Sequence, residues 1–428
     1  MAKGFKMRKA GVPQYYASEI DFPKYRKGET VVLFDADILA FKVSSVCETK
    51  YRFTHKENGD QYDAKSLTEF KDFLTDEKAS LSRKIMKLAQ RKQEDGKLSD
   101  TNEKRMARLR KELLECPEFE DFEREDFQVA DPFEYCAKTL NDAYDRVMKR
   151  LKAKKSELYI GGDENFRSEI PLKEEYKVSV RKDGVRPIHL TPSKEYLIKT
   201  KGAWKIKGIE ADDIIQMRAY QLALQGVKVY VYSNDKDRLQ AWYANWYNPD
   251  NDEILTLDSL LGEITAKKKG SGLKWLMFQC SQGDPTDGYS PKAWYAKRYG
   301  QVGFYNDFNE CDTVKGFLEK FIEVHRDRLL PEPLYEWDTW DGRHVKSNWL
   351  GIIEMMFSCA YMKLEIDDKR TFSSLCQEHG VDAGELVWEV YYDWDCPNEE
   401  LGCVRNVGSD GAVAIKVLEE LEKGDENA

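Results

Sequence analysis

Three short apolar runs end in aspartates and decide the fold: TVVLFDAD at residues 30–37, LYIGGD at 158–163 and VKVYVYSNDKD at 227–237. Runs of this length that are rich in β-branched and aromatic residues are typical of buried strands. Behind Glu210, apolar residues up to Leu222 recur at helical spacing. Strands that alternate with helices predict an α/β fold with a mostly parallel central sheet. Ligands of such sheets bind at the carboxyl ends of the strands, which is where these aspartates lie.

The composition excludes several classes of protein. The 428 residues suggest two or three domains, and 41% apolar with 34% charged residues excludes a wholly disordered chain. No run reaches the 18 apolar residues of a membrane-spanning helix, and the first thirty residues contain no apolar segment of a signal peptide. Nine cysteines without a C-x-x-C pair predict reduced thiols in a cytosol. The net charge of −10 would usually argue against a nucleic-acid partner.

The chain is expected to divide into four regions. These are a basic N-terminal arm at 1–28, a core at 29–48 plus 126–290, a charged helical insertion at 49–125 and a mainly helical C-terminal region at 291–428. Within the insertion, leucines repeat at helical spacing on both sides of the breaker Glu94-Asp95-Gly96. This pattern predicts a charged helical hairpin within residues 60–116. We interpret residues 119–126 as a polar linker back to the core.

Ten acidic residues lie at or near the predicted strand ends and the helix start. They are Asp35, Asp37, Asp163, Glu210, Asp212, Asp213, Asp235, Asp237, Asp284 and Asp287. Carboxylates that converge on one sheet edge repel each other, and divalent cations relieve that repulsion. Oxygen-only ligands favour Mg²⁺ or Mn²⁺ over zinc, and two such ions can promote phosphodiester cleavage. The alternative interpretation is that these acids cap helices or face solvent.

Five sequence blocks carry a resemblance. FDAD (34–37), GGDENFR (161–167), GIEADDII (208–215), SNDKD (233–237) and QGDPTDGYS (282–290) resemble, in this order, the flap endonuclease/5′–3′ exonuclease family. Within that family they are most similar to the T7-type bacteriophage 5′-exonucleases. The resemblance implies a PIN-like α/β nuclease core with two metal sites and a helical DNA-binding element after the last aspartates.

Carried over residue by residue, the resemblance implies two Mg²⁺ ions, for which Mn²⁺ can substitute. The expected ligands of the first ion are Asp35, Asp163, Glu210 and Asp212. The expected ligands of the second are Asp235, Asp237, Asp284 and Asp287, with Asp213 near both ions. Asp37 has an acidic counterpart in the phage relatives but not across the wider family, so its part in metal binding is left open.

The resemblance also assigns basic and aromatic residues. Lys177 and Arg181 resemble catalytic cations on an arch over the active site, where a fixed positive charge neutralises the scissile phosphate. Tyr176 and Arg167 are expected to contact DNA, with pairing of Arg167 to a site acid as the alternative. Ordinary surface cations are the other interpretation of this basic group.

The DNA clamp of the wider family follows its last aspartates. Lys292, Lys297 and Arg298 occupy this part of the chain and are expected to bind DNA. Only Gly300 and Gly303 match the glycines of the clamp, so its geometry is left open.

The resemblance implies a two-metal 5′–3′ exonuclease that degrades duplex DNA from 5′ ends. Flap endonuclease and RNase H-like activity on RNA·DNA hybrids are expected too, in phage DNA replication, recombination or host DNA degradation. The expected location is the cytoplasm, that of the bacterial host if a phage encodes the chain. A PIN-type endoribonuclease and a non-catalytic DNA-binding protein on a nuclease fold remain alternatives. The hairpin at 60–116 could hold DNA, a replication protein or no partner, and no membrane partner is expected.

Overall fold

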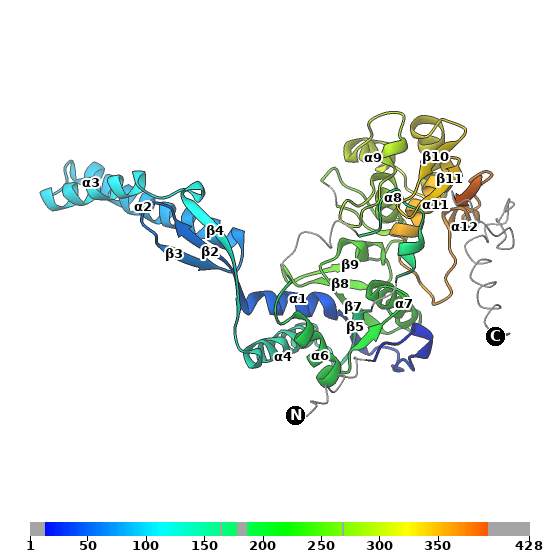
Figure 1. Ribbon diagram of the computed structural model, residues 1–428, viewed down its shortest axis with the longest axis horizontal. Helices are drawn as coiled ribbons and strands as arrows, with labels where there is room; N and C mark the ends of the chain where they lie inside the picture. Colours follow the sequence, from blue (N-terminus) through cyan, green and yellow to red (C-terminus); the bar gives the residue numbers. More distant parts are fainter. Residues whose placement is uncertain (1–12, 163–164, 178–185, 268, 393–428) are drawn as a thin grey trace, which may run out of the picture. The chain divides into compact units, whose positions relative to one another are not determined.

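The computed structural model describes residues 13–162, 165–177, 186–267 and 269–392 (Figure 1). As far as they are described, these residues form two compact units. Unit 1 comprises Met1–Ile38, Val147–Val185 and Leu197–Ala428, and unit 2 comprises Leu39–Arg146 and Arg186–Tyr196. Three helices contain residues of both units: α1 (Ala36–Val46), α4 (Phe133–Arg150) and α6 (Leu190–Lys201).

Unit 1 is built on a six-stranded sheet with the order β6-β5-β1-β7-β8-β9. Its strands are β1 (Thr30–Asp35), β5 (Lys155–Gly161), β6 (Trp204–Ile206), β7 (Lys228–Tyr232), β8 (Asn245–Asn248) and β9 (Glu253–Thr256). All neighbours pair in parallel except β8 and β9, which confirms the predicted α/β class and the mostly parallel sheet. The three strands that precede the aspartates, β5, β1 and β7, are neighbours in this sheet.

Helix α7 (Ala211–Leu224) packs against β1, β5 and β7. Its Ile214, Ile215 and Leu222 join Val31 and Leu33 of β1 in one apolar core. Because residues 31–35 of β1 are all buried, both faces of the sheet are covered at this strand. The packing therefore holds the start of α7 next to the carboxyl ends of the strands.

The C-terminal part of unit 1 surrounds a large aromatic and aliphatic core. Its helices are α8 (Gly272–Gln282), α9 (Gln301–Phe308), α10 (Val314–Ile322), α11 (Trp349–Ala360) and α12 (Phe372–Glu378), with a π-helical turn at Glu323–Leu329. An antiparallel sheet also lies here, formed by β10 (Tyr335–Asp338), β11 (Arg343–Ser347) and β12 (Trp388–Tyr392). The sequence predicted a mainly helical region here. It did not predict this sheet, because the short strands mix apolar and charged residues and so lack a clear strand pattern.

Unit 2 contains the predicted helical hairpin. Helices α2 (Leu67–Asp95) and α3 (Asp100–Leu114) pack on each other, and the predicted breaker ends α2 at Gly96, whose φ of 72° is left-handed (Figure 1). The Ser99 side chain then accepts a hydrogen bond from the Asn102 N–H and caps α3. Although α2 has 29 residues, no helix of the described ranges is both long and apolar enough to cross a membrane.

A three-stranded antiparallel sheet accompanies the hairpin and corrects the expectation of a purely helical insertion. Its strands are β2 (Glu48–His55), β3 (Gln61–Ala64) and β4 (Phe122–Ala130), with β2 in the centre. Residues 119–126 are therefore no linker, because most of them form the start of β4. The charged sequence of β4 does not follow an apolar strand pattern, because this strand is stabilised by its pairing with β2 rather than by apolar residues of its own. Unit 2 also extends beyond 49–125 on both sides.

Gly162, which follows β5, allows two chain segments to approach each other closely. A Cβ atom there would lie 1.9 Å from the carbonyl oxygen of Ile206 on β6. We predict that Gly162→Ala lowers the free energy of unfolding by about 1–3 kcal/mol, the usual effect of overpacking. Gly300→Ala is the control, because a Cβ atom there meets nothing within 4 Å. Chemical denaturation of both variants tests the prediction, and equal stabilities would contradict it.

Candidate active site

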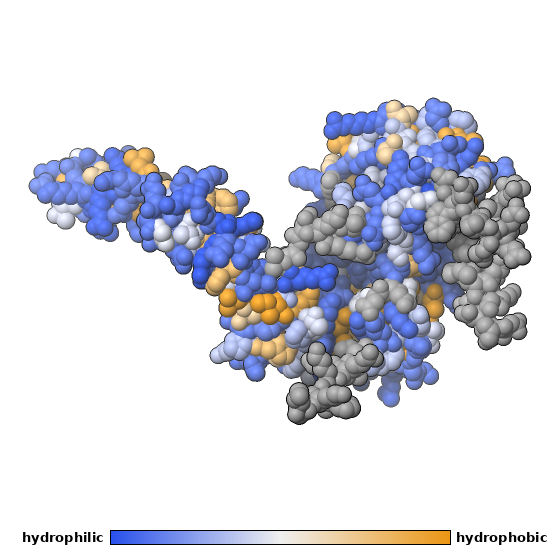
Figure 2. All heavy atoms as spheres, viewed as in Figure 1, coloured by the Kyte–Doolittle hydropathy of each residue, from blue (hydrophilic) through white to orange (hydrophobic). Residues whose placement is uncertain are grey.

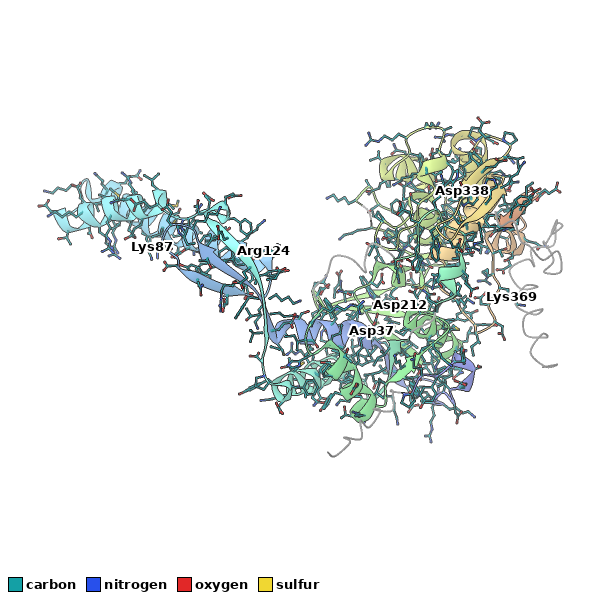
Figure 3. The ribbon with its side chains drawn as sticks, in the orientation of Figure 1. Asp37, Lys87, Arg124, Asp212, Asp338 and Lys369 are labelled. Carbon is teal, nitrogen blue, oxygen red and sulfur yellow. The ribbon has the colours of Figure 1, made fainter. Side chains whose placement is uncertain are left out.

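The expected site acids lie at the ends of strands and at helix starts. Asp35 ends β1, and Asp37 is in the first turn of α1. Glu210 is the N-cap of α7, followed by Asp212 and Asp213 in its first turn. Figure 3 labels Asp37 and Asp212 at the starts of these two helices.

The remaining acids come from two turns. Asp235 caps the short helix Lys236–Gln240, which contains Asp237. Asp284 and Asp287 lie in the turn that follows α8, where the Asp284 N–H donates to the Tyr289 carbonyl and the Gly288 N–H to that of Asp284. Two tight turns thus carry four carboxylates.

The structure brings these acids into one electrostatic network. The charges of Asp37 and Asp235 act on Asp35, that of Asp284 acts on Asp235, and that of Asp235 acts on Asp237. Asp287 interacts in turn with Glu210, Asp284 and Asp235. Carboxylates from β1, α7, the turn after β7 and the turn after α8 therefore share one site.

Burial and mutual repulsion raise the pKa of several of these carboxyls. Burial raises the pKa of Asp35 to about 7, although Arg238 opposes the shift. It also raises the pKa of Asp287 to about 6. The pKa of Asp237 is raised well above its ordinary value, first by burial and then by Asp235 and Asp287. Burial is thus the first cause of each of these shifts, and repulsion between neighbouring carboxylates adds to it.

Arg167 is the first of two buried arginines that hold the acids in place. Its side chain is 1% exposed, and its Nη atoms donate to both carboxylate oxygens of Asp213, at 2.7 and 3.0 Å. Nη1 also donates to Glu210 at 3.0 Å, and Nε and Nη2 donate to the carbonyls of Cys359 and Tyr361. The structure therefore shows the alternative in which Arg167 pairs with site acids, and corrects its placement among the DNA contacts.

Arg238 is the second buried arginine. It donates from Nη1 to the carbonyl of Asp212 at 2.6 Å and from Nη2 to the carboxylate of the same residue. Its Nη2 also lies 3.9 Å from Oδ2 of Asp35. Burial lowers the pKa of Arg238 to about 10, so it remains positive at neutral pH. Arg238 thus bridges two of the carboxylates expected at the first metal.

Two lysines contact the acids from the more open side. Lys177 Nζ lies 2.6 Å from Glu210 and 3.8 Å from Asp287, and Lys236 Nζ lies 2.7 Å from Asp284. Lys177 has a left-handed φ of 59°, uncommon for a non-glycine residue, and its N–H donates to the Asp287 carbonyl at 2.8 Å. Because their side chains are 32% and 53% exposed, these lysines can exchange partners more readily than the arginines.

Tyr176 lies beside this group but is not on the surface. It is 4% exposed, and its hydroxyl donates to Asp287 Oδ2 at 3.2 Å. The expected DNA contact is therefore corrected to a positioning contact for Asp287. Asp163 and Arg181 lie outside the described residues.

Lys292, Lys297 and Arg298 are exposed, as a DNA contact requires. They lie in and after the 3₁₀ turn Pro291–Trp294, ahead of α9. The structure thus leaves their assignment open to test.

The donor chemistry of the site fits Mg²⁺ or Mn²⁺. Only carboxylate oxygens are offered, and part of the rise in their pKa values comes from neighbouring carboxylates, a repulsion that a divalent cation would relieve. Among the residues that the structure describes, however, no three Asp, Glu, His or Cys side chains form a group that could hold a metal ion. Arg238, Lys177 and Lys236 take up carboxylate oxygens there instead.

Sequence reasoning missed Arg238, Lys236 and Gln279. Arg238 directly follows the block SNDKD, and Gln279, three residues before the block QGDPTDGYS, donates to Asp237 Oδ1. Acidic spacing predicts where carboxylates gather but not which cation or amide neutralises them. A sequence signal was available for Lys236 and Arg238, since a cation beside strand-end acids is a candidate counter-ion.

We predict that Arg167→Met destabilises the protein by about 3–5 kcal/mol, because it leaves Asp213 buried without a counter-charge. In Arg167→Met/Asp213→Leu both charges are gone, so much of the lost stability should return. Chemical denaturation measures the stability of the wild type, both single variants and the double variant, which together form a double-mutant cycle. Additive effects would contradict a direct Arg167–Asp213 coupling.

The raised pKa of Asp35 predicts a pH dependence in metal-free protein. Between the ordinary pKa of 3.8 and about 7, the folded chain holds a proton that the unfolded chain has lost. The free energy of unfolding should therefore fall as pH rises through this window, by on the order of 1.4 kcal/mol per pH unit. Asp35→Asn cannot titrate and should lack this contribution. Chemical denaturation in EDTA at pH 4.5 to 7.5 measures the difference in free energy of unfolding between the wild type and Asp35→Asn. A difference that does not change with pH would contradict the burial of the Asp35 carboxyl.

Comparison with known proteins finds local similarity to a protein named a nuclease. No protein-family model matches the chain. A curated 5′–3′ exonuclease of Buchnera aphidicola subsp. Acyrthosiphon pisum (strain APS) is 37% identical over 84 residues, 19% of this chain and 28% of the relative. The chain therefore matches about a quarter of that protein.

The chain is also similar to solved structures of proteins from bacteriophage T5. A T5 5′-exonuclease mutant is 16% identical, covering 52% of this chain and 76% of its own, at a TM-score of 0.33. A T5 flap endonuclease in a complex with DNA and metal ions is 19% identical, covering 44% and 71%, at a TM-score of 0.33. A T5 5′-exonuclease with bound zinc is 19% identical, covering 54% and 78%, at a TM-score of 0.34. Over 84 residues the chain is thus similar to a protein named a 5′–3′ exonuclease, while membership of that family and particular closeness to the T7-type enzymes stay predictions.

Proposed function

We propose that the chain is a divalent-metal-dependent 5′–3′ exonuclease that hydrolyses phosphodiester bonds of duplex DNA from 5′ ends. Flap endonuclease activity and hydrolysis of RNA·DNA hybrids belong to the same proposal. The observation that carries it is the convergence of carboxylates from β1, α7 and two turns on one site. The curated relative named a 5′–3′ exonuclease supports this choice of chemistry.

Two Mg²⁺ ions, or Mn²⁺ in their place, fit the excess of negative charge. Asp35, Asp163, Glu210 and Asp212 would hold the first ion, and Asp235, Asp237, Asp284 and Asp287 the second. Such ions activate a water and stabilise the leaving oxygen. Asp213, saturated by Arg167, would orient Glu210 through the shared arginine rather than ligate. Asp37 accepts the Gly161 N–H at 2.6 Å, which favours a role in positioning the end of β5.

The chain's own cations have separate roles in this proposal. Arg167 and Arg238 are buried and keep Asp213, Glu210 and Asp212 in place whether or not substrate is bound. Lys177 is partly exposed and would turn from Glu210 to the scissile phosphate, where a fixed charge favours the transition state. Arg181 would assist it, as its place in the sequence implies.

Duplex DNA with 5′ ends or flaps is the proposed substrate. The exposed Lys292, Lys297 and Arg298 would follow its backbone, since phosphate contacts position a duplex without reading its sequence. The T5 structure in complex with DNA is consistent with this assignment. The cytoplasm, that of the bacterial host if a phage encodes the chain, is the proposed location.

The test uses purified full-length protein with Mg²⁺ on three end-labelled substrates: a blunt duplex, a 5′ flap and a hairpin RNA. We expect cleavage of both DNA substrates from their 5′ side. Preferred cleavage of the RNA would establish the endoribonuclease alternative, and binding without cleavage would establish the non-catalytic one.

Asp212→Asn should lower the cleavage rate by about 10²-fold or more, the scale of losing one charge-stabilising interaction, while duplex binding in EDTA survives. The matched control is Asp367→Asn, which removes an exposed acid from a similar acidic run at 365–368. Near wild-type cleavage by Asp212→Asn in saturating Mg²⁺ would contradict the site assignment.

A further inference from the structure

Within unit 2, the strands β2, β3 and β4 and the helices α2 and α3 form two sections with separate cores. In the first section, Phe53 of β2, Phe122 of β4 and Phe70 and Leu74 of α2 pack together, and the rings of Phe53 and Phe70 stack at 3.8 Å. In the second, Leu88, Leu98, Met106 and Leu109 form a small seam between α2 and α3. The hairpin section, residues 81–111, thus consists of the end of α2 and most of α3, which are joined by a narrow apolar seam and by the Lys92–Glu103 ion pair.

Charge is distributed unequally between these sections. Residues 81–111 contain eleven Lys and Arg against four Asp and Glu. Residues 48–80 and 112–130, which surround the sheet, contain seven Lys and Arg against sixteen Asp and Glu. The hairpin section therefore has a net charge of +7 in a chain whose total is −10. Figure 2 shows a mostly hydrophilic surface over α2 and α3.

The cations of the hairpin section are available to a partner. All eleven are exposed. Three of them pair with acids of the same unit: Lys92 with Glu103, Arg108 with Glu112 and Lys111 with Glu115. Among the described residues, the other eight form no ion pair with Asp or Glu. They are Arg83, Lys84, Lys87, Arg91, Lys97, Lys104, Arg105 and Arg110.

Four of these cations share one side of α2. At 100° per residue, positions 83, 84, 87 and 91 lie within a sector of roughly 100° that borders the seam. This row of cations from 83 to 91, here called the ridge, is about 12 Å long, a distance over which one DNA strand rises past three or four phosphates along the helix axis, at about 3.4 Å each. Figure 3 labels Lys87 on this helix. Holding four like charges together on a helix is unfavourable unless a polyanion binds there.

We infer that the hairpin section of unit 2, residues 81–111, is a second DNA-binding surface that grips the duplex backbone without reading sequence. The choice of DNA as the polyanion rests on the proposed function. The absence of aromatic side chains between residues 81 and 111 excludes a base-stacking platform there and favours phosphate contacts. The acidic sheet section repels the same polyanion, which confines binding to the hairpin.

The test measures binding of the full chain to a blunt 40-bp duplex by fluorescence anisotropy, in EDTA and at several salt concentrations. The ridge variant changes Arg83, Lys84, Lys87 and Arg91 to Gln. Gln keeps the helix, and none of the four side chains packs in a core. Each lost phosphate contact should reduce the slope of log affinity against log salt by about 0.9, so we expect a slope shallower by roughly 2–4 and at least tenfold weaker binding.

A matched control removes the same charge elsewhere. It changes Lys315, Lys320, Arg326 and Lys346 to Gln, which are cations of unit 1 that already pair with acids. This control should bind and cleave like the wild type. The inference would be overturned if the ridge variant and the control had the same slope of log affinity against log salt. It would also be overturned if the ridge variant kept the wild-type slope.

A second variant keeps the test decisive if the ridge variant folds poorly. It changes Lys104, Arg105 and Arg110 on α3 to Gln and should lower the slope as well, whereas a wild-type slope would overturn the inference. Circular dichroism verifies folding of each variant. Wild-type cleavage in Mg²⁺ is measured separately on the same duplex, so its failure would contradict the proposed function and leave the binding comparison intact.

Discussion

The structure of unit 1 depends on neutralising carboxylates that converge at one edge of a parallel sheet. Strands β5, β1 and β7 are adjacent and parallel, so the residues that follow them must meet. Two kinds of cation neutralise these carboxylates. Arg167 and Arg238 are buried, permanently charged and bonded through several atoms, so the carboxylates they hold are fixed parts of the fold. Lys177 and Lys236 are partly exposed and each contact the acids through one ammonium group, so the charges they neutralise can pass to another cation.

This division sorts the acids by function. Asp213 is fully buried and bidentate with Arg167, which makes it a structural group although it adjoins Asp212 in the chain. Asp237 and Asp287 are the opposite case, because burial and neighbouring carboxylates raise their pKa. Acids that resist ionisation without a cation are the ones that gain most from a divalent ion. By the same criterion Asp35, at the end of β1, belongs with Asp237 and Asp287 among the acids for which added positive charge matters most.

The sequence predicted the parts of the fold that depend on local apolar pattern. The strand ends at Asp35 and before Ser233, the start of α7 behind Glu210 and the break at Gly96 are all local signals, and each appears in the structure. What it did not predict depends on partners distant in sequence. Strand β4 reads FEREDFQVA and is stabilised by β2, some seventy residues earlier. Arg167 meets Asp213 only because the fold brings them together, and no spacing rule links the two.

Net charge was the least informative property of the whole sequence. A total of −10 would argue against DNA if charge were spread evenly, but electrostatic attraction depends on the local field. The structure separates the charges: the described site acids of unit 1 lie buried or half-buried among cations, many acids of unit 2 surround its sheet, and the hairpin section carries +7 on exposed helices. Buried acids paired with arginine contribute little to the field in solvent, whereas exposed cations without acidic partners contribute most of it. A chain that is acidic on average can therefore present a basic surface to a polyanion.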